Sequence, residues 1–220
     1  TSLIVDPPTG RLPELKSGVE LVELSLGEDR SGTRPVRVRA AGIGADSYED
    51  RGLAERCLLG FTSGPPIVPA GYNQNIQLFQ TSDHVVILHE MVHDARIVPM
   101  DGRGHLPDEL QQWMGDSRGY WDGDALVVET ANFSAHSQHR FPSSANTVAV
   151  ERFRRMSADV VDYRFTITDP TLYTRPWTAH RMMPKLSDYV IYEYACHEGN
   201  YAMANILSGE RAEEKSASGK

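Results

Sequence analysis

The run of side chains with the clearest chemical potential is His89-Glu-Met-Val-His93, which matches the HExxH pattern of zinc metalloproteases. That pattern works on an α-helix, where residues i and i+4 share a face and two imidazoles can reach one zinc ion. The flanking residues are rich in Val, Ile and Leu, and they predict strands at about 84–91 and 94–100. On a strand the two imidazoles would lie about 13 Å apart. We therefore interpret the match as coincidental and do not expect a zinc protease of this type.

Charged side chains follow directly on the apolar run 85–88, which we expect to be a buried central strand. Because an unpaired buried charge costs several kcal/mol, these groups must find partners. Two interpretations are open. In the first, Arg96 pairs with Glu90 or Asp94 in a structural network. In the second, His93 is a general base or acid oriented by one of these carboxylates, and Arg96 holds an anionic or carbonyl group of a ligand.

A second polar cluster lies near the C-terminus, in Tyr192-Glu-Tyr-Ala-Cys-His-Glu-Gly-Asn-Tyr201. Tyr194 and His197 would supply donors, acceptors and a titratable imidazole to a polar pocket, where either could act as a catalytic acid. The alternative is a helix N-terminus, with Asn200 as its cap and the tyrosines in the core. Both interpretations are open.

A third cluster lies between two tryptophans, in Gln112-Trp-Met-Gly-Asp-Ser-Arg-Gly-Tyr-Trp121. It would suit the mouth of a site for an aromatic or sugar ligand, and a turn between packed aromatics would explain it equally well. The Gly- and Pro-rich segment 60–72 predicts a shaped loop beside it. The candidate substrate-binding residues are Tyr72, Asn73, Arg96, Trp113, Asp116 and Arg118. The chain lacks a GxSxG elbow, a P-loop, GxGxxG and CxxC, so serine hydrolase, nucleotide and zinc-ribbon chemistry have no support.

The charge and hydropathy of the chain exclude two classes of partner. The formal net charge of −8 argues against nucleic acid, which needs clustered Lys and Arg. We expect the short basic cluster at 152–155 to be the solvated face of a strand. The longest apolar runs, such as 85–88, have four residues, far short of the roughly 20 that span a bilayer, so we expect no membrane-spanning segment.

The periodicity after residue 74 is that of strands. Apolar and polar residues alternate most clearly at 161–168, which predicts a sheet with one buried and one solvated face. The predicted strands are at about 75–80, 84–91, 94–100, 118–121, 124–130, 147–155, 159–168, 174–182 and 189–195. The Asp-Gly pair in Trp121-Asp-Gly-Asp-Ala125 predicts one hairpin and 155–159 closes the next.

Consecutive strands with short turns and no βαβ rhythm predict a mainly β fold, an antiparallel meander that closes into a lipocalin-like barrel or a sandwich. Short helices are expected at about 47–58, capped by Ser47, at 107–114 and at 201–214. We divide the chain into an extended arm at 1–46 with at most one hairpin, a single domain at 47–214 and a disordered tail at 215–220. The two cysteines, Cys57 and Cys196, fit either one disulfide or two free thiols.

These motifs together resemble a family of exported bacterial proteins of unknown function, and the resemblance spans nearly the whole chain. The motifs that carry it are Asp6-Pro-Pro-Thr-Gly-Arg11, Glu55-Arg-Cys57, Gly71-Tyr-Asn73, Glu90-Met-Val-His-Asp-Ala-Arg-Ile-Val-Pro-Met-Asp-Gly102, Gln112-Trp-Met-Gly-Asp-Ser-Arg118, Trp121-Asp-Gly-Asp124 and Tyr192-Glu-Tyr-Ala-Cys-His-Glu-Gly-Asn200. The resemblance implies a periplasmic or secreted location and a disulfide between Cys57 and Cys196. The family string resembles EMxHDAR without a preceding His, so His89 is a peculiarity of this chain.

Three functions fit the sequence. The first is a periplasmic enzyme, a lyase, isomerase or hydrolase, that needs no metal or cofactor and uses His93 as base, Asp94 or Glu90 as its orienting carboxylate, and Tyr194 or His197 as acid. The second is a non-catalytic, lipocalin-like protein that binds a hydrophobic or aromatic ligand. The third is a metal-dependent enzyme with a site made by His93, His105 and His197. In all three the partner is a small molecule, and the C-terminal helix is compatible with a homo-oligomer interface.

Overall fold

The described residues form a mainly β fold, with antiparallel sheets and one α-helix. The computed structural model describes residues 2–19, 45–135, 137, 139 and 141–219. Its strands are β1 (Ile4–Asp6), β2 (Ile76–Gln80), β3 (His84–His89), β4 (Ala95–Pro99), β5 (Asp116–Asp122), β6 (Ala125–Ala131), β7 (Val148–Arg155), β8 (Val160–Thr168) and β9 (Trp177–Pro184). The helix α1 spans Tyr201–Ser218, and two 3-10 turns span Tyr48–Asp50 and Met91–His93.

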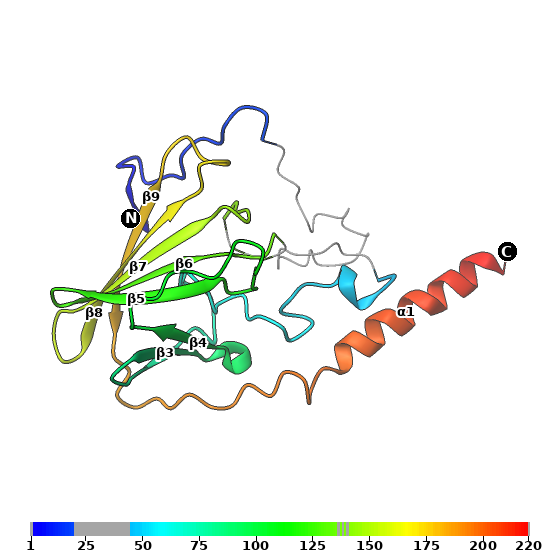
Figure 1. Ribbon diagram of the computed structural model, residues 1–220. Helices are drawn as coiled ribbons and strands as arrows, with labels where there is room; N and C mark the ends of the chain where they lie inside the picture. The colour runs from blue at the N-terminus through cyan, green and yellow to red at the C-terminus, as the bar shows by residue number, and fades with distance from the viewer. Residues whose placement is uncertain (1, 20–44, 136, 138, 140, 220) are drawn as a thin grey trace.

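The strands form two antiparallel sheets (Figure 1). The larger has six strands in the order β1-β9-β8-β7-β6-β5, and the smaller has three in the order β2-β3-β4. Within each sheet, the strands from β2 to β9 lie next to their neighbours in sequence. The two sheets meet where β4 packs beside β5, so this order continues from one sheet to the other. This order confirms the predicted antiparallel meander.

The core lies between the inner faces of the two sheets, where alternate residues of each strand point. In β8 the predicted alternation is confirmed, since Tyr163, Phe165 and Ile167 are fully buried. In β3 the inner residues are Val85, Ile87 and His89. Burying such a side chain contributes about 1.5 to 3 kcal/mol, so the two apolar faces hold the sheets together.

The close approach of β4 to β5 depends on Gly119, which lies in the middle of β5. A β-carbon at this position would lie 2.8 Å from Val98 Cγ1 of β4 and closer still to the sulfur of Met100. The missing side chain therefore lets the smaller sheet pack directly against the edge of the larger one.

Both predicted hairpins are present. Asp122 pairs with Ala125 across a turn in which Gly123 has a φ of 63°, a conformation that favours glycine. The next hairpin joins β7 to β8, with Arg155 opposite Val161.

Three predictions of local structure are wrong. The segment 47–58 is not a helix: Ser47 does cap a turn, through the N–H of Glu49, but only the 3-10 turn Tyr48–Asp50 follows, and irregular turns continue to Cys57. The segment 107–114 contains turns, and 189–195 is an extended segment without strand pairing. The last helix is present and continues to Ser218, so most of the predicted tail at 215–220 is helical.

The N-terminal arm is partly built into the larger sheet. Its strand β1 pairs with β9, with Ile4 opposite Ala179, and Leu15 forms an isolated bridge with Tyr173. Residues 20–44, where the rest of the predicted arm with at most one hairpin falls, lie outside the described residues.

The C-terminal region crosses the molecule outside the sheets. After β9, residues 185–200 run past the smaller sheet to α1, which projects away from it (Figure 1). We call residues 185–200 the strap. A disulfide between Cys57 and Cys196 attaches the strap to the loop after the first 3-10 turn, so the expected pairing is confirmed. No described helix is long and apolar enough to cross a membrane.

Candidate functional site

The most unusual feature of the interior is an ion pair between the two sheets. Arg96 of β4 donates through Nη1 to Glu151 Oε2 of β7, and the two residues are 4% and 0% exposed. The first interpretation of the sequence proposed that Arg96 pairs with Glu90 or Asp94. In the structure its partner is Glu151 instead. The register explains this: Arg96 lies opposite Ile87 on the inner face of β4, which points toward the larger sheet.

A tyrosine extends this pair into a chain of hydrogen bonds. The Tyr163 hydroxyl donates to Glu151 Oε1 at 2.6 Å and accepts from the backbone N–H of Ile67 at 2.8 Å. Burial raises the pKa of Tyr163 well above its usual value, and the Glu151 charge raises it further. Tyr163 therefore stays a neutral donor, and both oxygens of Glu151 are satisfied.

The Arg96 guanidinium is only half satisfied. Its Nε and Nη2 are buried and have no hydrogen-bond partner among the described residues. These two nitrogens form one edge of the guanidinium, with parallel N–H bonds that match the two oxygens of a carboxylate. A buried donor without an acceptor costs about 1 to 3 kcal/mol, so the site calls for an acceptor group or ordered water at this edge.

His89 shares this interior region. It lies two residues along β3 from Ile87, the residue opposite Arg96, and is 1% exposed. Burial lowers the pKa of His89 to about 3, and the Arg96 charge contributes. Both ring nitrogens lack partners among the described residues. His89 is therefore a neutral imidazole with free donor and acceptor capacity near the Arg96 cation, and it cannot serve as a general base near pH 7.

A groove of about 700 Å³ opens beside this interior, and Arg96 forms part of its wall. We call it the Arg96 groove. It also brings together two other predicted binding residues, Trp113 and Asp116. Leu58, Ile97 and Trp113 expose apolar surface in it, at 39%, 62% and 36%. An apolar wall with a few polar groups is the usual composition of a small-molecule site.

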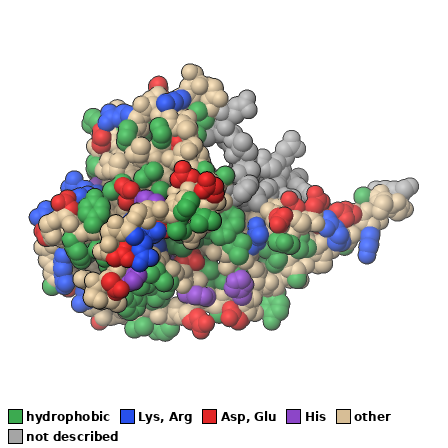
Figure 2. Space-filling view, in the orientation of Figure 1, with side chains coloured by type: hydrophobic (Ala, Val, Ile, Leu, Met, Phe, Trp, Pro, Cys, Tyr) green, Lys and Arg blue, Asp and Glu red, His purple; other side chains and the backbone are tan. Residues whose placement is uncertain are grey.

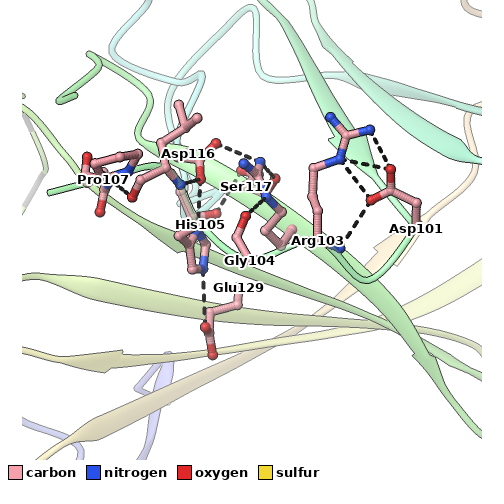
Figure 3. A network of polar contacts seen from close by, with 12 residues as sticks. Asp101, Arg103, Gly104, His105, Pro107, Asp116, Ser117 and Glu129 are labelled. Carbon is pink, nitrogen blue, oxygen red and sulfur yellow. Dashed lines mark hydrogen bonds and ion pairs between the residues drawn. The ribbon is translucent and has the colours of Figure 1, made fainter.

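Asp116 is the centre of a polar network on the outer side of β5 (Figure 3). Its Oδ1 accepts from Arg118 Nη1 at 2.6 Å, and its Oδ2 lies 2.9 Å from His105 Nδ1 and 3.0 Å from the N–H of Leu106. The other nitrogen of His105 lies 3.2 Å from Glu129 Oε1. Asp116 and Arg118 therefore lie together. Asp116 also holds the imidazole of His105, a residue that the sequence analysis assigned only to a metal site.

The predicted catalytic dyad does not form, because each carboxylate has other partners. Asp94 Oδ2 accepts from the Ser63 hydroxyl and from the N–H of Gly60 at 3.0 Å. Burial raises the pKa of Asp94, and the hydrogen bond from Ser63 opposes this effect. Asp94 therefore fixes the loop 60–63.

Glu90 is likewise a structural group. Its Oε2 accepts from Asn75 Nδ2 at 2.8 Å and its Oε1 accepts from the Tyr189 hydroxyl. That hydrogen bond raises the pKa of Tyr189. Glu90 thus holds the strap against the smaller sheet.

His93 is exposed and lies on the turn after β3, so it does not share a face with buried His89. Its Nδ1 lies 3.1 Å from the backbone oxygen of Tyr194 on the strap. The backbone of His93 has a left-handed φ of 46°, and that of the preceding Val92 has a φ of 60°. This conformation is strained for Val92, because valine is β-branched. Residues 89–93 therefore form the end of β3 and a 3-10 turn rather than an α-helix.

The other predicted site residues lie apart from the groove. His197 is exposed, and Tyr72 is 60% exposed and packs edge-on against Phe61. The backbone oxygen of Asn73 accepts a hydrogen bond from the Thr62 hydroxyl. Neither Tyr72 nor Asn73 lines the Arg96 groove. The described residues contain no group of three His, Cys, Asp or Glu side chains that could hold a metal ion. The metal site proposed for His93, His105 and His197 is therefore not formed.

The basic cluster on β7 is largely neutralised. Arg152 pairs with Asp122 at 2.8 Å and Arg154 with Asp124 at 3.1 Å. Charges of both signs are interspersed over the face shown in Figure 2. This pattern fits the expected solvated face of a strand.

No protein-family model matches this chain, and no curated protein and no solved structure is significantly similar to it.

Sequence reasoning missed Glu151, Tyr163 and His89 as members of the interior site. A signal was present for Glu151, because it alternates with Ala149 and Phe153 and so shares their buried face. A carboxylate in the middle of such a face requires a cation opposite it.

Proposed function

We propose that this protein binds a small organic molecule with a carboxylate or carbonyl group in the Arg96 groove. One observation carries the proposal: the Nε and Nη2 edge of buried Arg96 has no partner among the described residues, while Nη1 is held by Glu151. The Glu151 pair fixes the guanidinium, so its free edge is oriented before any ligand arrives. Such preorganisation lowers the entropic cost of binding.

The apolar surface of Leu58, Ile97 and Trp113 favours an aromatic or otherwise flat body for this ligand. The carboxylate of Asp116 in the same wall is already engaged by Arg118 and His105, so it does not repel an anion as a free carboxylate would. The proposal keeps Arg96, Trp113 and Asp116 as binding residues and assigns no catalytic role to His93, Asp94, Glu90, His197 or Tyr194.

We also propose that the two sheets form one lipocalin-like barrel. The contact of β4 with β5 and the ion pair across the interior support this arrangement. A periplasmic or secreted location is part of the proposal: the family resemblance suggests it, and the Cys57–Cys196 disulfide is compatible with an oxidising compartment.

The test is calorimetric titration with a panel of aromatic carboxylates, beginning with benzoate and indole-3-acetate. Arg96→Lys keeps the charge opposite Glu151 but removes the bidentate edge, so affinity should fall at least tenfold. Trp113→Ala should weaken binding by a similar factor. Its matched control is Trp121→Ala, because Trp121 is 50% exposed and does not line the groove. Equal binding by wild type and Arg96→Lys, or a crystal structure in which two fixed waters satisfy this edge in the presence of every compound, would contradict the proposal.

A second candidate is an acid–base enzyme that acts at the edge of the same groove, where Asp116 lines the groove and contacts His105. The 2.9 Å contact between Asp116 and His105 favours it, because a carboxylate on Nδ1 fixes the orientation of an imidazole. If compounds that bind are also transformed, His105→Gln should abolish turnover and leave binding intact. His84→Gln is the control, because His84, at the start of β3, also lies beside a carboxylate, that of exposed Asp83, and neither residue belongs to the Asp116 network.

A further inference from the structure

A second pocket, of about 650 Å³, lies between the smaller sheet and the end of β9. One wall comes from β2, the edge strand of the smaller sheet, and another from Arg181 to Pro184 of β9. The strap crosses it with Lys185, Leu186 and residues 189–191. We call it the strap pocket. It shares no lining residue with the Arg96 groove, so it is a separate site.

The walls of the strap pocket are largely apolar. Aliphatic side chains reach it from the loop before β2, from both strands and from the strap: Ile67, Ile76, Met183, Leu186, Val190 and Ile191. Leu186 and Val190 are 52% and 68% exposed, although an aliphatic side chain is stabilised by burial. The pocket therefore offers a place where a hydrocarbon chain would be removed from water.

The charge of the pocket has one sign. Arg181 and Lys185 line it, and none of its lining residues is Asp or Glu. Arg181 Nη1 is buried without a hydrogen-bond partner, and no ion pair joins Arg181 to any described residue. Burial lowers the pKa of Arg181. Glu90 lies near the pocket, but its carboxylate is occupied by Tyr189 and Asn75.

The strap is fixed to the rest of the molecule by side-chain contacts and by a disulfide. Tyr189 donates to Glu90, His93 contacts the backbone oxygen of Tyr194, and Cys196 is bonded to Cys57. The pocket is thus bounded by a segment that is covalently attached at one end and continuous with β9 at the other. A ligand held here would contact both the edge strand and the strap.

From these features we infer that the strap pocket binds an amphipathic organic anion, an aliphatic carboxylate whose head group pairs with Arg181 and Lys185 and whose chain packs against the aliphatic walls. Two cations without a carboxylate among them supply the charge complementarity. The inference does not depend on the ligand of the Arg96 groove, because the two sites have different walls.

The experiment compares decanoate with decanol by isothermal titration calorimetry. Decanoate should bind the wild type at least tenfold more tightly than decanol, since both have the same chain and only one has the charge. Arg181→Met should remove this preference and leave decanol binding unchanged. Arg164→Met is the matched control, because Arg164 is an exposed arginine that pairs with Asp162 on the same strand, β8, and does not line the pocket.

Lys185→Glu provides a second variant that should fold, because Lys185 is exposed and its backbone N–H, which donates to Asp159, is retained. It should weaken decanoate binding at least tenfold. The inference is overturned if wild type does not bind decanoate, if decanol binds as tightly, or if both Arg181→Met and Lys185→Glu bind decanoate as wild type does.

Discussion

Arg96 of β4 and Glu151 of β7 form an ion pair between the two sheets, and both side chains are almost completely buried. Removing one partner leaves a buried charge without compensation, which typically costs about 3 to 5 kcal/mol. Arg96→Met should therefore lower the free energy of unfolding by about that amount. Chemical denaturation followed by circular dichroism measures it.

The double variant Arg96→Met/Glu151→Gln is the control, because it removes both charges and keeps an acceptor for Tyr163. It should recover at least half of the loss. Arg154→Met, which breaks an exposed pair with Asp124, should cost only about 0 to 1 kcal/mol. If the double variant is as unstable as Arg96→Met, the uncompensated charge is not the cause of the loss.

Buried His89 makes stability depend on pH. Its pKa in the folded protein is about 3, against a usual value of 6.5. Between these values the unfolded chain binds a proton at this residue and the folded chain does not, so stability falls as the pH is lowered from 6.5 toward 3. His89→Leu should reduce this slope by about 1.4 kcal/mol per pH unit.

His139, whose pKa burial lowers to about 4, contributes a slope of the same sign that remains in the variant. His139→Leu is the comparison variant, because it should reduce the slope in the same direction. Urea denaturation at a series of pH values between 4 and 7 gives the comparison. An unchanged slope in His89→Leu would mean that His89 is not a buried neutral imidazole in the folded protein.

The Cys57–Cys196 disulfide spans 139 residues of sequence. In the chain-entropy model, closing a loop of this length stabilises the folded state by about 5 kcal/mol. The variant Cys57→Ser/Cys196→Ser should unfold at a lower denaturant concentration, and adding a reducing agent should affect only the wild type. Equal stability of the two proteins would show that the link does not constrain the unfolded chain.

Gly119 allows β4 to pack against β5, so a larger residue there should separate the sheets. Gly119→Val should destabilise the protein by about 1 to 3 kcal/mol, because its side chain would overlap Val98 and Met100. Gly209 in α1 has no neighbouring atom within 4 Å of an added β-carbon. Gly209→Ala should therefore be neutral or slightly stabilising, and thermal unfolding distinguishes the two variants.

The strands and their order could be predicted because each depends on information within a few residues. Period-two alternation identified β8, and the Asp-Gly pair placed the turn between β5 and β6. The segment 189–195 has the same local composition, but nothing pairs with it, since it leaves the sheet after Pro184 as the strap. A helix at 47–58 was expected from its cap and first turn, yet Gly52 and left-handed Cys57 lie within it.

The candidate site was harder to predict, because its contacts join distant parts of the sequence. Arg96 was recognised as a binding residue, but its partner Glu151 lies 55 positions away on another sheet. Local reasoning favoured Glu90 and Asp94, which are near in sequence but point to Asn75 and Ser63. Asp116 and Arg118 were grouped correctly because they are two residues apart on the same face of β5.

The pairing of β1 with β9 has a consequence for how the chain assembles. The strands from β5 to β9 pair with their neighbours in sequence, so they can form by local hairpin closure, whereas β1 must close a loop of more than 170 residues to reach Ala179. Loop-closure entropy therefore favours docking of β1 after the rest of the sheet has formed. Until then β9 has an open edge, and unpaired strand edges are where chains join to one another. The short N-terminal strand thus protects each newly folded molecule from its neighbours.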